Sequence, residues 1–314
     1  MAVPPPVTPT VTGRPPGQRL AAWIQATRPP FLVATLLPVM TGLALVARQT
    51  GQVNWPLALL TLVGSLAMQI GTNLANDYYD FVQYRGDVPY EGGSGVIQEG
   101  KLSLADVYRG TWVTFAFTAA VGIYLGTRST PLVWLLTAIG LIGAIYYSAP
   151  PIRFGYRGWA EVVCGISMGP VIVLGVYMVQ TGRPSWEALA VSFPLASFVA
   201  MILYGESIHD IQQDQQTGKW TVAARLGETR AVAAMMAWIA ATGVLSVLGV
   251  ATGLLPRLLL LELVPMALVL RVLRPWAGKR EGGPDTAKPR FGRLALRLYL
   301  STGLLLFLGL ALGL

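Results

Sequence analysis

Apolar runs of about 20 residues recur along the whole chain, and an α-helix needs a run of that length to cross roughly 30 Å of hydrocarbon. Nine such runs are present, at residues 29–48, 55–76, 107–126, 131–148, 159–180, 185–205, 231–253, 256–273 and 292–313. Only 12% of the residues are charged, whereas soluble globular proteins carry about 25%. The pattern predicts an all-α, polytopic membrane protein with nine transmembrane helices.

The basic residues alternate with the predicted helices. The loops on one side and their flanks hold 19 of the 23 Lys and Arg residues, whereas Arg48, Arg128, Arg183 and Arg257 lie on the other side. Cytoplasmic loops of membrane proteins are enriched in Lys and Arg. The distribution therefore predicts a cytoplasmic N-terminus and an external C-terminus, and it explains the net charge of +8 without nucleic-acid binding.

The chain is expected to form one domain behind a short leader. Residues 1–18 are rich in Pro and poor in large apolar residues, so we expect them to be disordered. Residues 19–314 then form a single transmembrane domain. Cys164 is the one cysteine in the sequence and lies within a predicted helix. Because there is a single cysteine, an intrachain disulfide and a Cys-based metal site are excluded.

Polar residues concentrate where the second predicted helix ends. Asn73, Asn76, Asp77 and Asp80 are spaced i, i+3, i+4 and i+7, which places them on one face if the helix continues through them. The loop at 81–106 that follows contains five glycines, and we interpret it as a lid.

A second group of acids lies at the end of the sixth predicted helix. Glu206, Asp210 and Asp214 are four residues apart, so they share a face if that helix extends to include them. On the predicted topology, both groups lie on the cytoplasmic side. Two helix ends would then present columns of oxygen ligands to the same side of the membrane.

Acids at helical spacing repel one another unless a cation lies between them. Mg²⁺ prefers oxygen ligands, usually one or two carboxylates completed by water and substrate phosphates. The two columns are therefore typical of a Mg²⁺–diphosphate site. Arg28, Arg153 and Lys219 lie in three different segments on the same predicted cytoplasmic side. Arg can hold a diphosphate with two parallel hydrogen bonds, and Lys can act as a point charge.

Two other interpretations stay open on this evidence. The acids could simply be solvated where helices meet the cytosol. A transporter could also carry acids, although its acids usually lie near the bilayer midplane on broken helices. Two acid-rich helix ends with cations nearby favour an enzyme.

Several stretches of the chain are similar to a known family. Asn-Asp-Tyr-Tyr-Asp at 76–80 and Asp-Ile-Gln-Gln-Asp at 210–214 resemble the two aspartate-rich motifs of the UbiA superfamily of intramembrane prenyltransferases. The chain looks most like the menaquinone branch, which prenylates 1,4-dihydroxy-2-naphthoate. Ala-Thr-Arg-Pro at 26–29, Gly-Gly-Ser-Gly-Val-Ile at 92–97 and Tyr-Tyr-Ser-Ala-Pro-Pro at 146–151 carry the same likeness.

One stretch departs from that branch. Where its members usually have Asn-Asn-x-Arg-Asp, this chain has Glu206-Ser-Ile-His209-Asp210. Glu206 could still bind metal. His209, the only histidine, would replace Arg as a pH-dependent cation that helps to hold the diphosphate.

The resemblance implies nine helices around a central cavity, with transfer of a polyprenyl group from polyprenyl diphosphate to an aromatic acceptor. The expected acceptor is 1,4-dihydroxy-2-naphthoate, with 4-hydroxybenzoate, homogentisate or a tetrapyrrole as alternatives. It also implies a protein of the plasma membrane, with an active site toward the cytoplasm and with Mg²⁺ as the cofactor.

The resemblance assigns roles to individual residues. The expected metal ligands are Asn73, Asn76, Asp77, Asp80, Glu206, Asp210 and Asp214. The expected catalytic residues are Asp77, Asp80, Asp210, Asp214 and Lys219. The expected substrate-binding residues are Arg28, Asn73, Tyr147, Arg153 and His209. The ring of Tyr147 would face the allylic cation, unless this tyrosine only belongs to the interfacial belt.

Overall fold

Long helices make up the protein. The computed structural model describes residues 16–84, 93–278 and 288–314, and within these ranges it is helical without any β-strand. All nine predicted spans coincide with helical segments of the described residues. The apolar runs therefore predicted the all-α class and the positions of the helices correctly, whereas nine membrane crossings stay a prediction. The long helices are α2 (Val33–Thr50), α3 (Trp55–Tyr84), α4 (Leu104–Arg128), α5 (Leu132–Ser148), α6 (Ala160–Ile166) with α7 (Ile172–Thr181), α8 (Trp186–His209), α11 (Glu228–Ala251), α12 (Leu263–Ala277) and α13 (Phe291–Leu312).

Six of these segments are long and apolar enough to cross a membrane. They are α2, α3, the continuous rod from α6 to α7, α8, α11 and α13. Helix α5 is apolar but has only 17 residues, and α12 has 15. Helix α4 is long but carries Asp106 and Arg109 near its start and Arg128 at its end. The chain is a multi-pass membrane protein.

The rod from α6 to α7 contains one irregular turn. A π-helical segment, η3 (Ser167–Val171), joins the two helices around Pro170. Proline has no backbone N–H to donate, so it interrupts the regular ladder of an α-helix. The interruption stays local, and the rod runs on as one unit.

Helix α8 lies at the centre of the bundle and is the most buried of the six apolar helices. It packs against α13 at a point where both helices carry glycine. A Cβ built on Gly205 would overlap the backbone nitrogen of Gly292, so the two backbones approach as closely as small residues allow. This contact holds the end of α8 in place against the start of α13.

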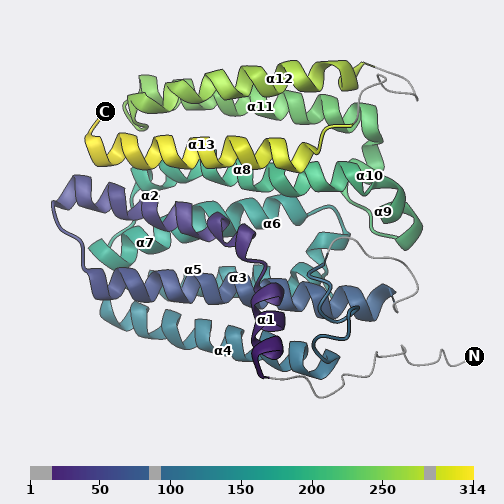
Figure 1. The fold of residues 1–314 in the computed structure, drawn as a ribbon. Coiled ribbons are helices and arrows are strands. Elements are labelled where there is room, and N and C mark those ends of the chain that lie inside the picture. Colours follow the sequence, from purple (N-terminus) through teal and green to yellow (C-terminus); the bar gives the residue numbers. More distant parts are fainter. Residues whose placement is uncertain (1–15, 85–92, 279–287) are drawn as a thin grey trace, which may run out of the picture.

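The shorter elements lie where the long helices are connected. Helix α1 (Pro16–Thr27) precedes the first predicted span, while α9 (Ile211–Thr217) and α10 (Val222–Leu226) follow α8. Figure 1 shows α9 and α10 at one end of the bundle and the C-terminus at the other end. The sequence did not predict these three helices, because none is long enough or apolar enough to give a membrane signal.

The predicted leader and lid lie partly outside the described residues. Of residues 1–18, only the last three are described, and they begin α1. Of the loop at 81–106, residues 85–92 are not described. Its later part packs through Val96, Ile97 and Leu102 against α1 and the end of α3.

The prediction that one continuous helix carries the second group of acids is wrong. The sequence placed Glu206, Asp210 and Asp214 on one continuous helix. In the structure α8 ends at His209, Asp210 caps it with a φ of −91° and a ψ of 6°, and the separate helix α9 begins at Ile211. The regular helix is therefore interrupted at Asp210, and Glu206 belongs to a different element from Asp214. Backbone hydrogen bonds still link the two helices, because the N–H of Asp210 donates to the carbonyl oxygen of Glu206 at 3.1 Å and the N–H of Asp214 donates to that of Asp210 at 2.7 Å.

Candidate active site

Asp77 ties three segments of the chain together. It lies near the end of α3 and is 4% exposed. Its carboxylate accepts hydrogen bonds from the Arg28 guanidinium, from the backbone N–H of Ser94 at 3.0 Å and from the Ser94 hydroxyl. Arg28 precedes α2, and Ser94 belongs to the connection between α3 and α4. Asp77 therefore holds both of these segments against the end of α3.

Asp80 lies one turn beyond Asp77 and is 2% exposed. Its carboxylate accepts hydrogen bonds from the Tyr156 hydroxyl and from Asn76 Nδ2 at 3.0 Å. Asn76 Nδ2 also donates to Ser148 Oγ at 3.2 Å, while Asn76 Oδ1 accepts from Arg28 Nη2 at 3.0 Å. The predicted column on α3 is therefore correct in its geometry, and its members are linked to one another.

Arg28 has a strained backbone. Arg28 (φ 53°) and Arg153 (φ 52°) are the two non-glycine residues with a positive φ in the described part of the chain. A residue held in this region costs roughly 1–3 kcal/mol, and such strain clusters at functional sites. The Nε atom of Arg28 is buried and has no hydrogen-bond acceptor. This side chain therefore keeps one donor that a bound anion would satisfy.

The second motif surrounds Asp214 on α9. Asp214 is 4% exposed; its carboxylate accepts a hydrogen bond from the Thr221 hydroxyl at 2.9 Å and lies 3.7 Å from Lys219 Nζ. Burial raises the pKa of Asp214, while Lys219 and Thr221 oppose that rise. Gly218 ends α9 with a φ of 73°, and this turn brings the N–H of Lys219 to the carbonyl oxygen of Asp214 at 2.8 Å.

Tyr156 joins the two motifs. Its hydroxyl donates to Asp80, its carbonyl oxygen accepts from the N–H of Trp220 at 2.9 Å, and its ring lies 5.8 Å from Lys219 Nζ. Tyr156 ends the short 3₁₀ helix η2 (Phe154–Tyr156) between α5 and α6. The structure thus connects Asp80 and Asp214 through one tyrosine and one lysine, although 134 positions separate the two aspartates.

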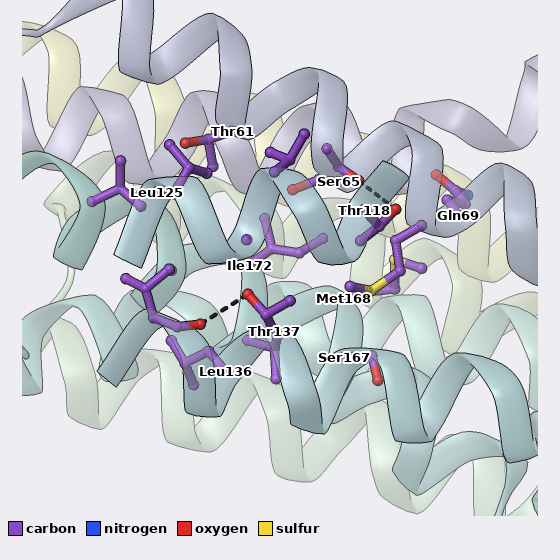
Figure 2. Close-up of a pocket in the computed structure, with 18 residues that line it drawn as sticks. Thr61, Ser65, Gln69, Thr118, Leu125, Leu136, Thr137, Ser167, Met168 and Ile172 are labelled. Carbon is purple, nitrogen blue, oxygen red and sulfur yellow. Dashed lines mark hydrogen bonds between the residues drawn. The ribbon is translucent and has the colours of Figure 1, made fainter. Parts of the chain in front are cut away.

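An apolar pocket lies inside the bundle between α3, α4, α5, η3 and α7. Figure 2 shows its lining, with Thr61, Ser65 and Gln69 on α3 facing Met168 and Ile172 across the hollow. The remaining lining residues are Gly64, Met68, Thr118, Val121, Gly122, Leu125, Val133, Leu136, Thr137, Ser167, Val171, Gly175 and Val179. Gln69 lies one turn before Asn73 on α3, so the pocket leads toward the first motif.

Comparison with known proteins agrees with this arrangement. The model of the UbiA prenyltransferase family matches residues 35–297. The chain belongs to the UbiA prenyltransferase family. It is 33% identical to a Mycobacterium leprae protein named 1,4-dihydroxy-2-naphthoate octaprenyltransferase, over 84% of this chain and 88% of that protein.

Further similarity extends across the family. A Bacillus subtilis protein with the same name is 31% identical over 68% of each chain. The solved structure of a UbiA homologue from Archaeoglobus fulgidus bound to DMAPP and Mg²⁺ superposes with a TM-score of 0.60 at 18% identity, covering 91% of this chain and 98% of that one. This likeness shows that the bundle has the UbiA fold.

Glu206 and His209 both contact the start of α13 in this UbiA bundle. The carboxylate of Glu206 lies against Gly292 at the start of α13. His209 packs on the ring of Phe291, with ring centroids 5.3 Å apart, and its Nε2 accepts a hydrogen bond from the N–H of Phe291 at 3.2 Å. A nitrogen that accepts a hydrogen bond carries no proton. The structure therefore joins both residues to α13 rather than to Asp214.

The three remaining predicted substrate-binding residues lie around the first motif. Asn73 Nδ2 donates to the carbonyl oxygen of Thr27 at 3.0 Å, which anchors the segment that carries Arg28. Tyr147 lies near the end of α5, and its ring closes over Gly155. Arg153 donates to Gln83 at 2.7 Å and lies 5.7 Å from the ring centre of Tyr156.

Several polar residues of the site were not predicted as functional. Ser94 and Ser148 lie in stretches that carry the family resemblance, and Thr221 follows Lys219 closely. No pattern pointed to Tyr156, because a tyrosine in a loop has no helical spacing relative to the acids. Glu161, on the first turn of α6, is 5% exposed, and neither of its carboxylate oxygens has a hydrogen-bond partner. No sequence pattern indicated a function for Glu161, because it lies within a predicted span.

The acids can contribute to a metal site without forming a complete one. Within the described residues, no three His, Cys, Asp or Glu side chains converge closely enough to hold an ion by themselves. Mg²⁺ usually needs only one or two carboxylates when a substrate diphosphate supplies further oxygens. Asp77, Asp80 and Asp214 are buried carboxylates with the ligand chemistry that such a site requires.

Proposed function

We propose that this UbiA family member transfers a polyprenyl group from polyprenyl diphosphate to 1,4-dihydroxy-2-naphthoate. The observation that carries the proposal is the polar network that links Asp77 through Arg28, Asn76 and Tyr156 to Asp214. Asn76 lies two turns along α3 from Gln69, which lines the apolar pocket. A polyprenyl diphosphate matches both features, because its charged head suits the polar network and its water-insoluble tail suits the apolar pocket. The names of the bacterial relatives support the choice of acceptor.

In this proposal the diphosphate binds between the two motifs. Asp77, Asp80, Asp210 and Asp214 would hold Mg²⁺ at the bound diphosphate, and Asn73 and Asn76 would add amide oxygens. A bound Mg²⁺ would neutralise charge on the diphosphate. The A. fulgidus homologue was solved with DMAPP and Mg²⁺, which supports the same pairing here. Glu206 and His209 are left out of the set because they contact α13.

The cations of the site stabilise the leaving diphosphate. Arg28 offers its unpaired Nε donor, and Lys219 approaches from the second motif. As the C1–O bond of the donor breaks, negative charge builds on the diphosphate, and fixed cations stabilise that charge. The ring of Tyr147 faces the allylic cation, and the apolar surroundings exclude water, which would otherwise quench that cation.

The prenyl tail occupies the apolar pocket. On α3 the lining residues Thr61, Ser65 and Gln69 continue at helical spacing into Asn73, Asn76 and Asp80, so one face carries both pocket and acids. Gln69 and Asp80 are 11 residues apart, about 16 Å along a helix. A donor with its diphosphate near Asp80 would therefore direct its tail down this face and into the pocket.

The proposed topology has nine membrane crossings, a cytoplasmic N-terminus and the acid motifs on the cytoplasmic side of the plasma membrane. The uneven distribution of Lys and Arg supports it. The nine long helical segments also alternate in direction, so the end of α3, the start of α6 and the end of α8 belong to the same side of the bundle.

An acceptor panel tests the proposed function. Purified protein in liposomes would receive a polyprenyl diphosphate, Mg²⁺ and one of four acceptors: 1,4-dihydroxy-2-naphthoate, 4-hydroxybenzoate, homogentisate or a tetrapyrrole. We expect a prenylated product, identified by mass spectrometry, with 1,4-dihydroxy-2-naphthoate. A product with another acceptor alone would refute the proposed acceptor, and no product with any would refute aromatic prenyl transfer.

A further inference from the structure

The proposed reaction needs a group that accepts a proton from the aromatic acceptor, and the acids of the two motifs are occupied. Asp77 already accepts from Arg28 and Ser94, Asp80 from Tyr156, and Asp214 from Thr221. Glu161 differs from them, because it is buried to the same degree but has no hydrogen-bond partner at either oxygen.

A buried carboxylate without a partner is costly. Burial of such a group without a partner is unfavourable, and more so if it is charged, so each case in a folded protein calls for an explanation. A ligand that donates a hydrogen bond to Glu161 would remove this cost. The unpaired oxygens therefore indicate a binding partner that carries an O–H or N–H donor.

The position of Glu161 indicates which ligand that is. Glu161 precedes Met168 by seven residues, so the two side chains share a face of the rod formed by α6, η3 and α7. Met168, Ile172, Gly175 and Val179 line the apolar pocket from this rod. Glu161 thus lies on the pocket face of the rod, two turns from the pocket lining and toward the end that carries the acid motifs.

The loop before α6 fixes this position. Gly158 has a φ of 82° and packs closely on Trp220. A Cβ added at Gly158 would lie 3.1 Å from the carbonyl oxygen of Trp220. Trp220 in turn donates to the carbonyl oxygen of Tyr156 at 2.9 Å. The start of α6 is therefore docked on the segment that carries Lys219.

The charged and titratable groups around Glu161 come from four parts of the fold. They are Tyr147 of α5, Cys164 of α6, Tyr204 of α8, and Asp214 and Lys219 of the second motif. Lys219 is the cation among them. In the proposed reaction, Glu161 would therefore lie between the diphosphate and the apolar pocket, where the reacting ring would be held.

We propose that Glu161 binds a hydroxyl group of the aromatic acceptor and takes its proton during transfer. This inference rests on the proposed function, since it assigns a role within that reaction. The acceptor O–H bond breaks, and its proton moves to a carboxylate oxygen of Glu161. The electron pair released to the ring forms the new bond from a ring carbon to C1 of the prenyl group, as the C1–O bond to the diphosphate breaks.

The last steps restore the aromatic ring and the carboxylate of Glu161. The substituted ring carbon loses its hydrogen as a proton to the diphosphate, or its carboxyl group as carbon dioxide. The electron pair left behind restores the aromatic ring, and Glu161 gives its proton back to the ring oxygen. Atoms and charge balance without any oxidant or reductant, and Glu161 ends as it began.

The test compares Glu161→Gln with wild type over pH 6–10 at saturating prenyl diphosphate and Mg²⁺. Gln keeps the size and hydrogen-bonding ability of the side chain but cannot accept a proton. General-base catalysis is worth about 10²–10⁴-fold, so kcat near neutral pH should fall by at least about 100-fold. As pH rises toward the acceptor hydroxyl's own ionisation, near 10 for a phenol such as Tyr, the variant should recover about tenfold per pH unit while wild type stays flat.

Glu262→Gln is the matched control. Glu262 is 1% exposed and also has an unpaired buried oxygen, but it lies in η4 (Arg257–Glu262), beyond the far end of α11. It should keep the wild-type profile. Both variants should match wild type in thermal melting and in Mg²⁺-dependent binding of an unreactive prenyl diphosphate analogue. The first measurement excludes loss of the fold, and the second excludes loss of donor binding.

The outcomes separate this inference from the proposed function. If wild type transfers prenyl groups and Glu161→Gln does so with the same kcat and pH profile, Glu161 is a neutral buried acid and the inference is wrong. If Glu161→Gln does not fold, Glu161→Asp decides: a reduced rate with a flat profile supports the base, and a rate that rises with pH overturns it. If wild type transfers to no aromatic acceptor, the proposed function itself fails.

Discussion

Tyr156 contacts residues of both acid motifs, although the sequence did not single it out. Its hydroxyl donates to Asp80, its backbone holds Trp220, and its ring lies beside Lys219. A loop tyrosine gives no pattern in a sequence, because its partners come from α3 and from the segment after α9. The acids could be predicted from their spacing along one helix, whereas the hydroxyls that bind them come from segments distant in the sequence.

The Tyr156→Phe variant tests the hydroxyl separately from the ring. A hydrogen bond to a charged group contributes roughly 1.5–3 kcal/mol, so we expect the rate of prenyl transfer to fall by about 10–100-fold while the ring still supports Lys219. Steady-state kinetics at saturating donor would measure the loss. Tyr124→Phe, at an exposed position on α4, should behave as wild type. An unchanged rate in Tyr156→Phe would mean that the link between the motifs has no catalytic value.

His209 shows that a position beside an acid motif in the sequence does not determine which residues a side chain contacts. Its place beside Asp210 in the sequence suggested a cation for the diphosphate, yet its ring packs on Phe291 and its Nε2 accepts a hydrogen bond from that residue. The direction of a side chain at the end of a helix depends on the neighbouring helix, which sequence spacing alone does not specify.

The pH profile tests the structural interpretation of His209. Because the imidazole contacts α13 as a neutral acceptor, we expect His209→Ala and His209→Arg to retain the wild-type dependence of initial rate on pH at subsaturating donor, with lower thermal stability. The stability loss would be seen in melting temperature. An alkaline fall in rate that disappears only in His209→Arg would instead show that a protonated His209 holds the diphosphate.

At the scale of elements, the positions of the long helices followed from hydropathy, but their ends did not. The break between α8 and α9 at Asp210 is an example, since the acids on either side have perfect helical spacing. The end of α8 is instead fixed by close contact with α13, through Gly205 and Gly292. This contact joins residues 87 positions apart, and no local pattern reveals it.

The Gly205→Ala variant tests that contact. A methyl group there would overlap the backbone of Gly292, and overpacking typically costs roughly 1–3 kcal/mol. We expect a lower melting temperature and reduced transfer, because Asp210 follows directly. Gly175→Ala is the control for stability, since its Cβ would lie 3.9 Å from the nearest atom, in Leu136. Equal melting temperatures for both variants would show that α8 and α13 can separate without cost.

At the scale of the whole molecule, the distribution of Lys and Arg supports the proposed topology. These residues concentrate at the end of the bundle that carries both motifs, and we propose that this end faces the cytoplasm, from which a water-soluble acceptor would reach the site. Such an arrangement lets the tail stay among apolar helix faces while the diphosphate stays in contact with water and ions.

Cysteine labelling tests this orientation. In a Cys164→Ser background, a cysteine at Gln98, which is exposed in the connection between α3 and α4, should react with a membrane-impermeant maleimide only from the cytoplasmic side. Cysteines at Gln52 and Arg183, in the connections at the other end, should react only from outside. The reverse pattern would contradict the predicted orientation, and labelling of all three from one side would contradict the alternation of the helices.

The central claim is that two acid motifs, far apart in sequence, serve one Mg²⁺–diphosphate site. The most direct measurement is the rate of prenyl transfer to 1,4-dihydroxy-2-naphthoate by Asp77→Asn, Asp210→Asn and the control Asp106→Asn, over a range of free Mg²⁺. We expect each motif variant to lose at least about 100-fold in kcat at every Mg²⁺ concentration, while Asp106→Asn retains wild-type activity and all lose activity without Mg²⁺. Near-normal transfer by a folded Asp77→Asn or Asp210→Asn protein would contradict the shared site.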